Sequence, residues 1–108
     1  MDNLTITEKT NDNFVLLTVS GSINSYTYHE FETKIYNLIK EHSIVLDVAR
    51  VTNLSSSGLG FLMAASEDGA DAGHKIYILN PSEVVKLAIA STGFSEVFPI
   101  IHSLDEIK

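Results

Sequence analysis

The residues best suited to chemistry in this sequence are three consecutive serines, Ser55-Ser56-Ser57, which run directly into Gly58-Leu59-Gly60. Before them, the apolar run over 44–48 is typical of a strand buried on both faces. After them, apolar residues recur at helical spacing over 59–66. The serines are therefore expected where a strand's outgoing loop becomes the N-terminus of a helix. Unpaired N–H groups and a partial positive charge make such a place suitable for an anion, or for a hydroxyl that is converted into one.

The simplest role for the serines is helix capping. One serine at the N-cap stabilises a helix by about 1 kcal/mol. Capping accounts for one hydroxyl, but not for three, and not for the pair of glycines that follows. A second interpretation, a loop whose serines are bound or modified by another protein, therefore stays open, because loops carry function disproportionately.

Signatures of enzymes and of cofactor sites are missing from the sequence. Metal sites usually need closely spaced ligands, and the histidines lie far apart at His29, His42, His74 and His102. The serines lack the preceding glycine of G-x-S-x-G. The Gly58-Leu59-Gly60 segment has neither the lysine of a P-loop nor the third glycine of a dinucleotide fingerprint. We therefore predict that the chain is not an enzyme and that it holds no metal and no cofactor.

Length and composition predict a single domain over 1–108. The sequence is 44% hydrophobic and 19% charged, which is ordinary for a globular protein. No apolar segment approaches the roughly 20 residues of a membrane span, and the first residues have no basic region followed by an apolar one, so no secretory signal is expected. Without cysteine, disulfides and thiolate metal sites are excluded. By elimination, we expect a cytoplasmic protein.

The charge balance argues against one class of partner. The chain carries 14 acidic and 7 basic residues, a net charge of -7, and the basic residues are scattered. Binding to nucleic acid depends on Lys and Arg that neutralise phosphates, so we predict no nucleic-acid partner. An acidic surface is suited to docking on basic patches of other proteins.

The hydrophobic pattern predicts a succession of strands and helices. Strands over 5–9 and 14–20, joined by a turn at 11–13, form a hairpin. The remaining elements follow in order: a helix from about Thr27 to Glu41, a strand over 44–48, a helix over 58–72, a strand over 75–79, a helix from Ser82 to Gly93, a strand over 97–101 and a last helical turn over 103–108. The order β-β-α-β-α-β-α-β(-α) predicts an α/β fold with a mixed, mostly parallel sheet of four to five strands packed by amphipathic helices.

Details of this pattern give sharper expectations. Thr27-Tyr28-His29-Glu30 matches a capping box at the start of the first helix. Gly69 is unfavourable inside a helix by about 1 kcal/mol, so the last turns before Gly73, a candidate C′ residue, are expected to be loose. The third helix is expected to bury Val84, Val85, Ala88 and Ile89. Gly21 is expected to end its strand, so that 22–25 and the serine loop follow two strand ends and form one surface if those strands are neighbours.

Several of these segments together resemble the STAS domain of bacterial anti-sigma factor antagonists. The resemblance rests on Gly21-Ser22-Ile23-Asn24 with the helix after it, on Val45-Leu46-Asp47-Val48 and on the serine loop over 55–60. It continues through the strand over 75–79 to Thr92-Gly93-Phe94 and Val97-Phe98, and so covers essentially the whole chain. In that family the loop usually reads Asp-Ser-Ser/Thr-Gly-Leu-Gly.

The resemblance implies a partner switch. Alignment on Gly58-Leu59-Gly60 places Ser56 at the family's phosphorylated position and Ser57 at its Ser/Thr position. The implied partner is an anti-sigma factor that is itself a serine kinase; the unphosphorylated antagonist binds it, phosphorylation releases it, and a serine phosphatase resets the switch. The implied partner-binding residues are Ile23, Asn24, Ser55, Ser56, Ser57, Gly58, Leu59 and Gly60.

Two residues depart from the family pattern. Ser55 stands where the family has an aspartate, and Asn24 replaces the acid of its Gly-x-Ile/Leu-Asp segment. Both keep hydrogen-bonding capacity. Ser55 and Ser57 remain alternative phosphate acceptors, and a constitutive binding or scaffold module that is never phosphorylated, or a small-ligand sensor, remain alternative functions.

Overall fold

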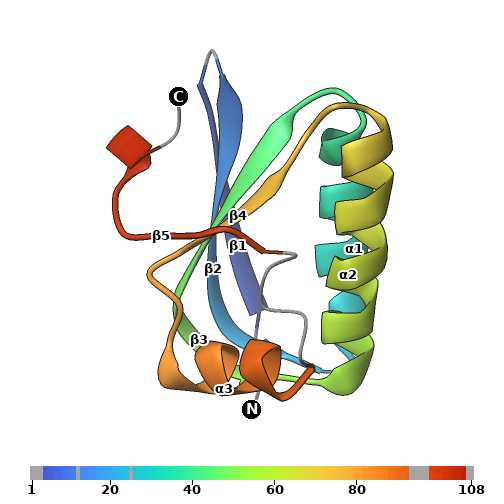
Figure 1. Ribbon diagram of the computed structural model, residues 1–108. Coiled ribbons are helices and arrows are strands. Elements are labelled where there is room, and N and C mark those ends of the chain that lie inside the picture. Colours follow the sequence, from blue (N-terminus) through green and yellow to red (C-terminus); the bar gives the residue numbers. More distant parts are fainter. Residues whose placement is uncertain (1–3, 12, 25, 93–97, 107–108) are drawn as a thin grey trace.

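The computed structural model describes residues 4–11, 13–24, 26–92 and 98–106. Within them the chain forms strands, helices and a short 3-10 helix in an order that follows the predicted one (Figure 1). In chain order the elements are β1 (Leu4–Thr10), β2 (Phe14–Ile23), α1 (Tyr28–Ile39), β3 (Ser43–Leu54), α2 (Ser56–Asp71), β4 (Ile76–Leu79), α3 (Glu83–Thr92), β5 (Ile100–Ile101) and the 3-10 helix η2 (Leu104–Glu106).

The strands form one five-stranded sheet in the order β1-β2-β3-β4-β5. β1 and β2 pair antiparallel as a hairpin, and every later neighbour pairs in parallel. The predicted α/β fold with a mixed, mostly parallel sheet is therefore confirmed. The last predicted strand is present as the short β5, which forms one edge of the sheet, as expected from the neighbouring Pro99. Gly93 and Val97, at which the third helix was predicted to end and the last strand to begin, lie outside the described residues.

The two central strands are longer than predicted. β2 continues past Gly21 to Ile23, and β3 continues past Val48 to Leu54, so the prediction that residue 21 ends its strand was wrong. Register shifts between Thr18 and Ser20, and again between Gly21 and Ser22, mark bulges in this pair. A bulge inserts an extra residue and breaks the regular alternation of side chains while the strand continues. The sequence pattern therefore ended β3 too early, whereas β2 was ended too early at Gly21, which lies inside the strand with φ +105°.

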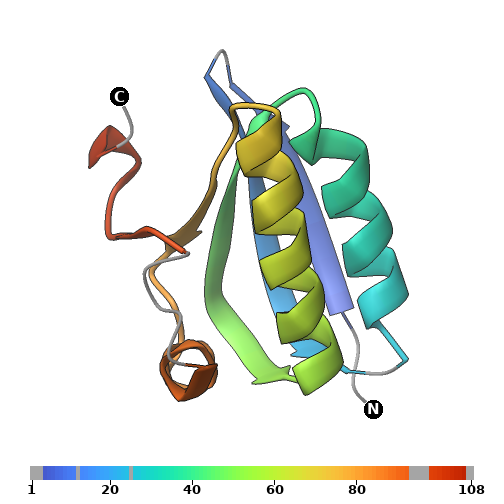
Figure 2. The same cartoon turned by 45° about the vertical axis from the view of Figure 1, so that its right-hand side comes forward.

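Helices α1 and α2 lie side by side and cover one face of the sheet, whereas α3 lies at the end of the sheet where β2 and β3 finish (Figures 1 and 2). The main core lies between this face and the helices. It contains buried side chains from the strands and from all three helices, among them Leu17, Ile35, Leu46, Leu62 and Ile89. This burial of the apolar helix stripes is the main driving force for the fold.

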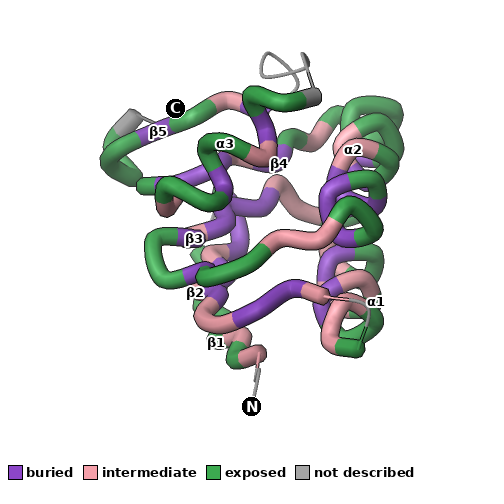
Figure 3. Tube along the Cα trace, turned by 90° about the horizontal axis from the view of Figure 1, so that it is seen from below, coloured by how far each residue is buried: buried purple, intermediate pink, exposed green. Residues whose placement is uncertain are grey.

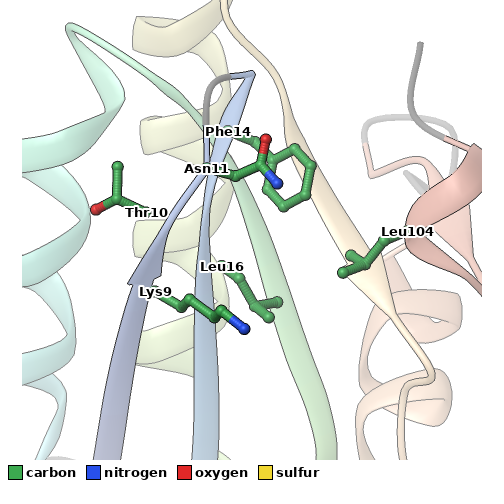
Figure 4. Close-up of a pocket in the computed structure, with 6 residues that line it drawn as sticks. All are labelled: Lys9, Thr10, Asn11, Phe14, Leu16 and Leu104. Carbon is green, nitrogen blue, oxygen red and sulfur yellow. The ribbon is translucent and has the colours of Figure 1, made fainter.

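The opposite face of the sheet carries a smaller apolar cluster. It consists of Phe14, Val45, Leu79 and Ile101, with partly buried side chains packed against it. η2 follows β5 and its Leu104 lines a small hollow of about 110 Å³ beside the β1–β2 hairpin (Figure 4). The last helical turn predicted over 103–108 is therefore present as a 3-10 helix.

Two expectations about the helix starts and faces were wrong. Thr27 makes no side-chain cap bond, because its hydroxyl instead donates to the Ser22 carbonyl at 2.7 Å and accepts from the Asn24 N–H at 2.9 Å. In α3, Val85 is buried but Val84 is 38% exposed. Val85 lies on the side of α3 that packs into the core, whereas Val84, about 100° away around the helix, lies toward solvent.

The end of α2 is ordered by packing where a loose end was expected. Gly69 is buried, and a Cβ built there would lie 2.7 Å from Ile39 Cγ1 and 2.9 Å from its Cδ1. The missing side chain thus lets the ends of α1 and α2 approach closely. After the helix, Gly73 adopts φ +83°, and the His74 N–H donates to the Gly69 carbonyl at 2.7 Å. This is the Schellman arrangement expected for a C′ glycine.

Candidate functional site

The two loops predicted to form one surface are held together directly. Ser22 pairs with Asn53, and Ile23 pairs with Leu54, where β2 and β3 end. The Ser55 N–H then donates to the Ile23 carbonyl at 2.8 Å. The loop after β2 and the serine loop therefore adjoin at the carboxyl ends of neighbouring parallel strands, and the expectation of a single surface is confirmed. Figure 3 views this end of the molecule, with buried strand segments next to exposed loop segments.

Ser55 is the serine that caps the helix. Its hydroxyl accepts from the Gly58 N–H at 3.2 Å, and its carbonyl accepts from the Leu59 N–H at 3.0 Å. Its own backbone is extended, with φ −72° and ψ 161°, as is usual for an N-cap residue. With Ser55 at the cap, α2 begins at Ser56, two residues earlier than the predicted start at Gly58.

Ser56 and Ser57 are the first two residues of α2, and both are exposed. Within the described residues neither hydroxyl makes a hydrogen bond, in contrast to Ser55. The first turn of this 16-residue helix contains no acidic residue. Because the first N–H groups of a helix lack internal partners and carry the positive end of its dipole, a negative group here is stabilised by about 0.3–1 kcal/mol.

Asn24 organises the neighbouring loop. Its Oδ1 accepts from the Tyr26 N–H at 2.8 Å and from the Thr27 N–H at 3.1 Å. Its Nδ2 donates at 3.2 Å to the hydroxyl of Ser22, which also accepts from Asn53 Nδ2 at 3.3 Å. All five of these residues are uncharged, so the network links the two strand ends without a carboxylate.

A steric contact sets how closely the two loops approach. A Cβ built on Gly58 would lie only 2.7 Å from Ile23 Cγ2 and 3.2 Å from Leu54 Cδ1. The same construction on Gly60 meets no atom within 4 Å. Gly58 is thus required for close packing, whereas the second glycine of the pair is exposed and faces open space.

The residues predicted to bind a partner fall into three groups by exposure. Ile23, Gly58 and Leu59 are buried, so they hold the loops in position and do not face solvent. Asn24 and Ser55 are partly exposed and are held by the hydrogen bonds described above. The side of the site open to solvent consists of Ser56, Ser57 and Gly60. Their role in partner binding stays a prediction.

Three residues of this site, Ser22, Asn53 and Tyr26, were not among those predicted for it from the sequence. Ser22 is the one buried polar residue among the described positions, and it links Asn24 to Asn53. Tyr26 is 91% exposed, next to the loop that Asn24 holds. The sequence does contain a polar residue at each strand end, Ser22 and Asn53. Their pairing could be recognised only once the register of β2 against β3 was known.

The part of the chain that the structure describes contains no group of three or more His, Cys, Asp or Glu side chains able to hold a metal ion. None of the helices in that part is long and apolar enough to cross a membrane. The polar groups that the structure brings together at the site are hydroxyl groups, amides and a helix N-terminus.

A family model described as the STAS domain matches residues 5–107. The chain is 27% identical over 100 residues to an anti-sigma-B factor antagonist of Staphylococcus epidermidis, which covers 91% of this chain and 93% of that protein.

Solved structures show the same architecture. A crystal structure of an anti-sigma factor antagonist from Mycobacterium paratuberculosis is similar with a TM-score of 0.82 and 25% identity, over 96% of this chain and 90% of that one. The Bacillus cell fate determinant SpoIIAA in its phosphorylated form is similar with a TM-score of 0.74 and 16% identity, over 95% of this chain and 96% of that one. The similarity in fold thus extends over nearly the whole chain.

Proposed function

Because the chain belongs to the STAS domain family, we propose that it is an anti-sigma factor antagonist that works by switching partners. The observation that carries the proposal is the state of Ser56, an exposed hydroxyl without a hydrogen bond in the described structure, at the N-terminus of α2. It lies in the loop that adjoins the Asn24 loop, where the family motif has its phosphorylated serine. The curated relative from Staphylococcus epidermidis, an anti-sigma-B factor antagonist, supports the same role.

The proposed phosphate acceptor is Ser56. Ser55 uses its hydroxyl and backbone to begin the helix, which leaves it less available to a kinase. Ser57 is exposed like Ser56 and serves as the matched comparison, since alignment on Gly58-Leu59-Gly60 assigns it the neighbouring Ser/Thr position. SpoIIAA, a protein of similar fold, has been solved in a phosphorylated form.

The electrostatics of the site favour a switch that leaves the domain folded. A phosphate adds about −1.5 to −2 charge at the positive end of α2, where the first turn has no carboxylate to repel it. Asn24 and Ser55 are neutral at the two positions where the family has acids. The added charge and bulk are therefore accommodated within the domain and act on the docked partner.

The proposed partner is an anti-sigma factor that is a serine kinase, and a serine phosphatase restores the unphosphorylated form. The docking surface combines the serine loop with the partly exposed Asn24. Tyr26 extends it, because an exposed aromatic side chain beside a binding loop is a frequent centre of protein interfaces. The role implies a cytoplasmic protein, since sigma factors act there.

Phosphorylation is tested by incubating the chain with ATP and each serine-kinase anti-sigma factor of its source organism, followed by mass spectrometry. We expect one phosphate on Ser56, no phosphate on the Ser56→Ala variant, and unchanged phosphorylation of Ser57→Ala. A phosphate that maps to Ser57 would move the acceptor by one residue. No phosphate on 55–57, under conditions where the two proteins bind, would exclude the phosphoswitch.

Binding is tested separately by calorimetry with the same anti-sigma factor. Ser56→Ala should bind like the unmodified chain, whereas Ser56→Asp should bind at least about tenfold more weakly, a loss of about 1.4 kcal/mol. Asn37→Asp is the matched control, because it adds the same charge to an exposed residue near the far end of α1. Tyr26→Ala should also weaken binding by about tenfold or more.

A second candidate function follows from the neutral residues at the site. With Ser55 and Asn24 engaged in structural hydrogen bonds and carrying no charge, the chain is also suited to be a constitutive binding module. Equal affinities of Ser56→Ala and Ser56→Asp for the anti-sigma factor would favour this function over the switch.

A further inference from the structure

A bulge in β3 turns two neighbouring side chains to the sheet face away from α1 and α2. Thr18 pairs with Asp47, but Ser20 pairs with Arg50, so two steps along β2 match three along β3. Val48 and Val51, on either side of the extra residue, are buried in the main core at 3% and 2% exposure. The residues between them, at 49 and 50, are both exposed. Bulges of this kind re-aim side chains and are frequent beside functional sites.

These side chains border a hollow of about 390 Å³, a size within the range of small-molecule sites. The hollow lies over three neighbouring parallel strands, β2, β3 and β4. Thr18 pairs with Asp47, and Asp47 pairs with Leu79, the last residue of β4. The lining residues are Thr18, Val19, Asp47, Ala49, Arg50 and Asn80.

Hydrogen bonds next to the hollow hold the surrounding backbone in place. Ser82, at the start of α3, donates its N–H to the Val48 carbonyl at 3.3 Å and its hydroxyl to the Val51 carbonyl at 2.8 Å. Asn80 has φ +47°, a left-handed conformation that is uncommon outside glycine, and its N–H donates to the Ile101 carbonyl at 3.1 Å. The hollow is therefore formed by the fold before any ligand binds.

Opposite charges face this hollow without pairing. Arg50 is the only arginine in the sequence, and its guanidinium group forms no ion pair or hydrogen bond with any residue that the structure describes. Asp47 accepts at Oδ1 from the Ala49 N–H at 3.3 Å and likewise forms no ion pair within the described ranges. Arg50 and Asp47 thus line one hollow, and their charged groups have hydrogen-bonding capacity left unused.

We propose that this hollow binds a small zwitterion of the amino-acid type. The planar fork of Arg50 matches a carboxylate, Asp47 accepts from the ammonium group, and Thr18 and Asn80 bond to the remaining polar atoms. The net charge of -7 disfavours ligands with several negative charges, whereas a zwitterion has no net charge to be repelled. The hollow lies on the sheet face away from α1 and α2, so the proposal does not depend on the serine loop.

The test is an NMR titration of the ¹⁵N-labelled chain with each of the common L-amino acids. At least one should produce saturable shifts of the backbone amides at 18, 49, 50 and 80. For that amino acid, the N-acetyl derivative, which lacks the positive charge, and the amide, which lacks the negative charge, should each bind at least about tenfold more weakly.

Variants then locate the site. Arg50→Gln should reduce the affinity at least about tenfold, while Lys75→Gln, which removes a different exposed positive charge, should leave it unchanged. An unchanged far-UV circular dichroism spectrum of Arg50→Gln shows that the variant is folded, as expected for an exposed side chain. The proposal is overturned if no amino acid gives saturable shifts at millimolar concentration, if the single-charge derivatives bind equally well, or if Arg50→Gln binds normally.

Discussion

The two glycines of the serine loop provide the sharpest test of how the site is built. Ala at Gly58 would place its Cβ 2.7 Å from Ile23 Cγ2, whereas carbon atoms pack best at about 3.5–4.0 Å. Ile23 is β-branched and 1% exposed, so its methyl group cannot rotate away freely. Ala at Gly60 meets nothing within 4 Å. The two substitutions are chemically identical, lie two residues apart in α2 and differ in what the new methyl group contacts.

The magnitudes follow from this difference. Replacing Gly by Ala inside a helix stabilises by up to about 1 kcal/mol, and this contribution is shared by both variants. Overpacking at Gly58 costs about 1–3 kcal/mol. Gly60→Ala should therefore be more stable than the unmodified chain by up to about 1 kcal/mol, and more stable than Gly58→Ala by about 1–3 kcal/mol. For a domain of this size that difference is a melting temperature higher by at least about 4 °C.

The assay is urea and thermal unfolding of both variants followed by circular dichroism, with amide hydrogen exchange as a local measurement. In Gly58→Ala the Ser55 N–H should exchange faster, because the added methyl group pushes against Ile23, whose carbonyl accepts from that N–H. Equal stability of the two variants, together with normal protection of Ser55, would refute the conclusion that close packing at Gly58 holds the two loops together.

Three further predictions concern stability and are checked by the same unfolding measurements. Ser55→Ala should lose about 1 kcal/mol because it removes the cap of α2, whereas Ser57→Ala, at an exposed helical position, should change stability by less than about 0.5 kcal/mol; a larger loss at Ser57 would contradict the assignment of the cap. Gly69→Ala should be destabilising because of its contact with Ile39, and the double variant with Ile39→Val, which removes one of the two close carbons, should be more stable than additivity predicts by at least about 0.5 kcal/mol. Ser82→Ala should lose about 1 kcal/mol by freeing the β3 carbonyl that its hydroxyl now satisfies; an unchanged midpoint would show that this hydroxyl does not hold the bulge.

Much of the fold was predictable because its signals are local. The strand over 44–48 is a nearly continuous apolar run, and Phe31, Ile35 and Ile39 recur at helical spacing and are all buried. Gly73 ends α2 because a left-handed residue is needed there, and the sequence pattern predicts it directly. Alternating strands and helices then leave few topologies, and the mixed sheet follows.

The candidate site was predictable in position but not in detail. A serine triplet between a buried strand and an amphipathic helix indicates a helix N-terminus, and one serine was expected to cap it. Three consecutive hydroxyls look alike in sequence, so only the backbone of the folded chain separates Ser55, which caps, from Ser56 and Ser57, which face solvent. The prediction of a capping box at Thr27 was wrong for a related reason, since the Thr27 hydroxyl accepts from the Asn24 N–H and donates to the Ser22 carbonyl and does not cap the helix.

Sequence by itself determined the type and order of the elements, the serine loop at a helix N-terminus and the resemblance that names the family. Tertiary structure alone decided which residues meet. The bulges in β3 set the register that places Asn53 beside Ser22 and turns Arg50 toward the open face. The close approach of Gly58 to Ile23 depends on the same pairing. Periodicity is a property of neighbours along the chain, whereas register and steric contact arise between residues more than 30 positions apart, and only the folded chain brings these together.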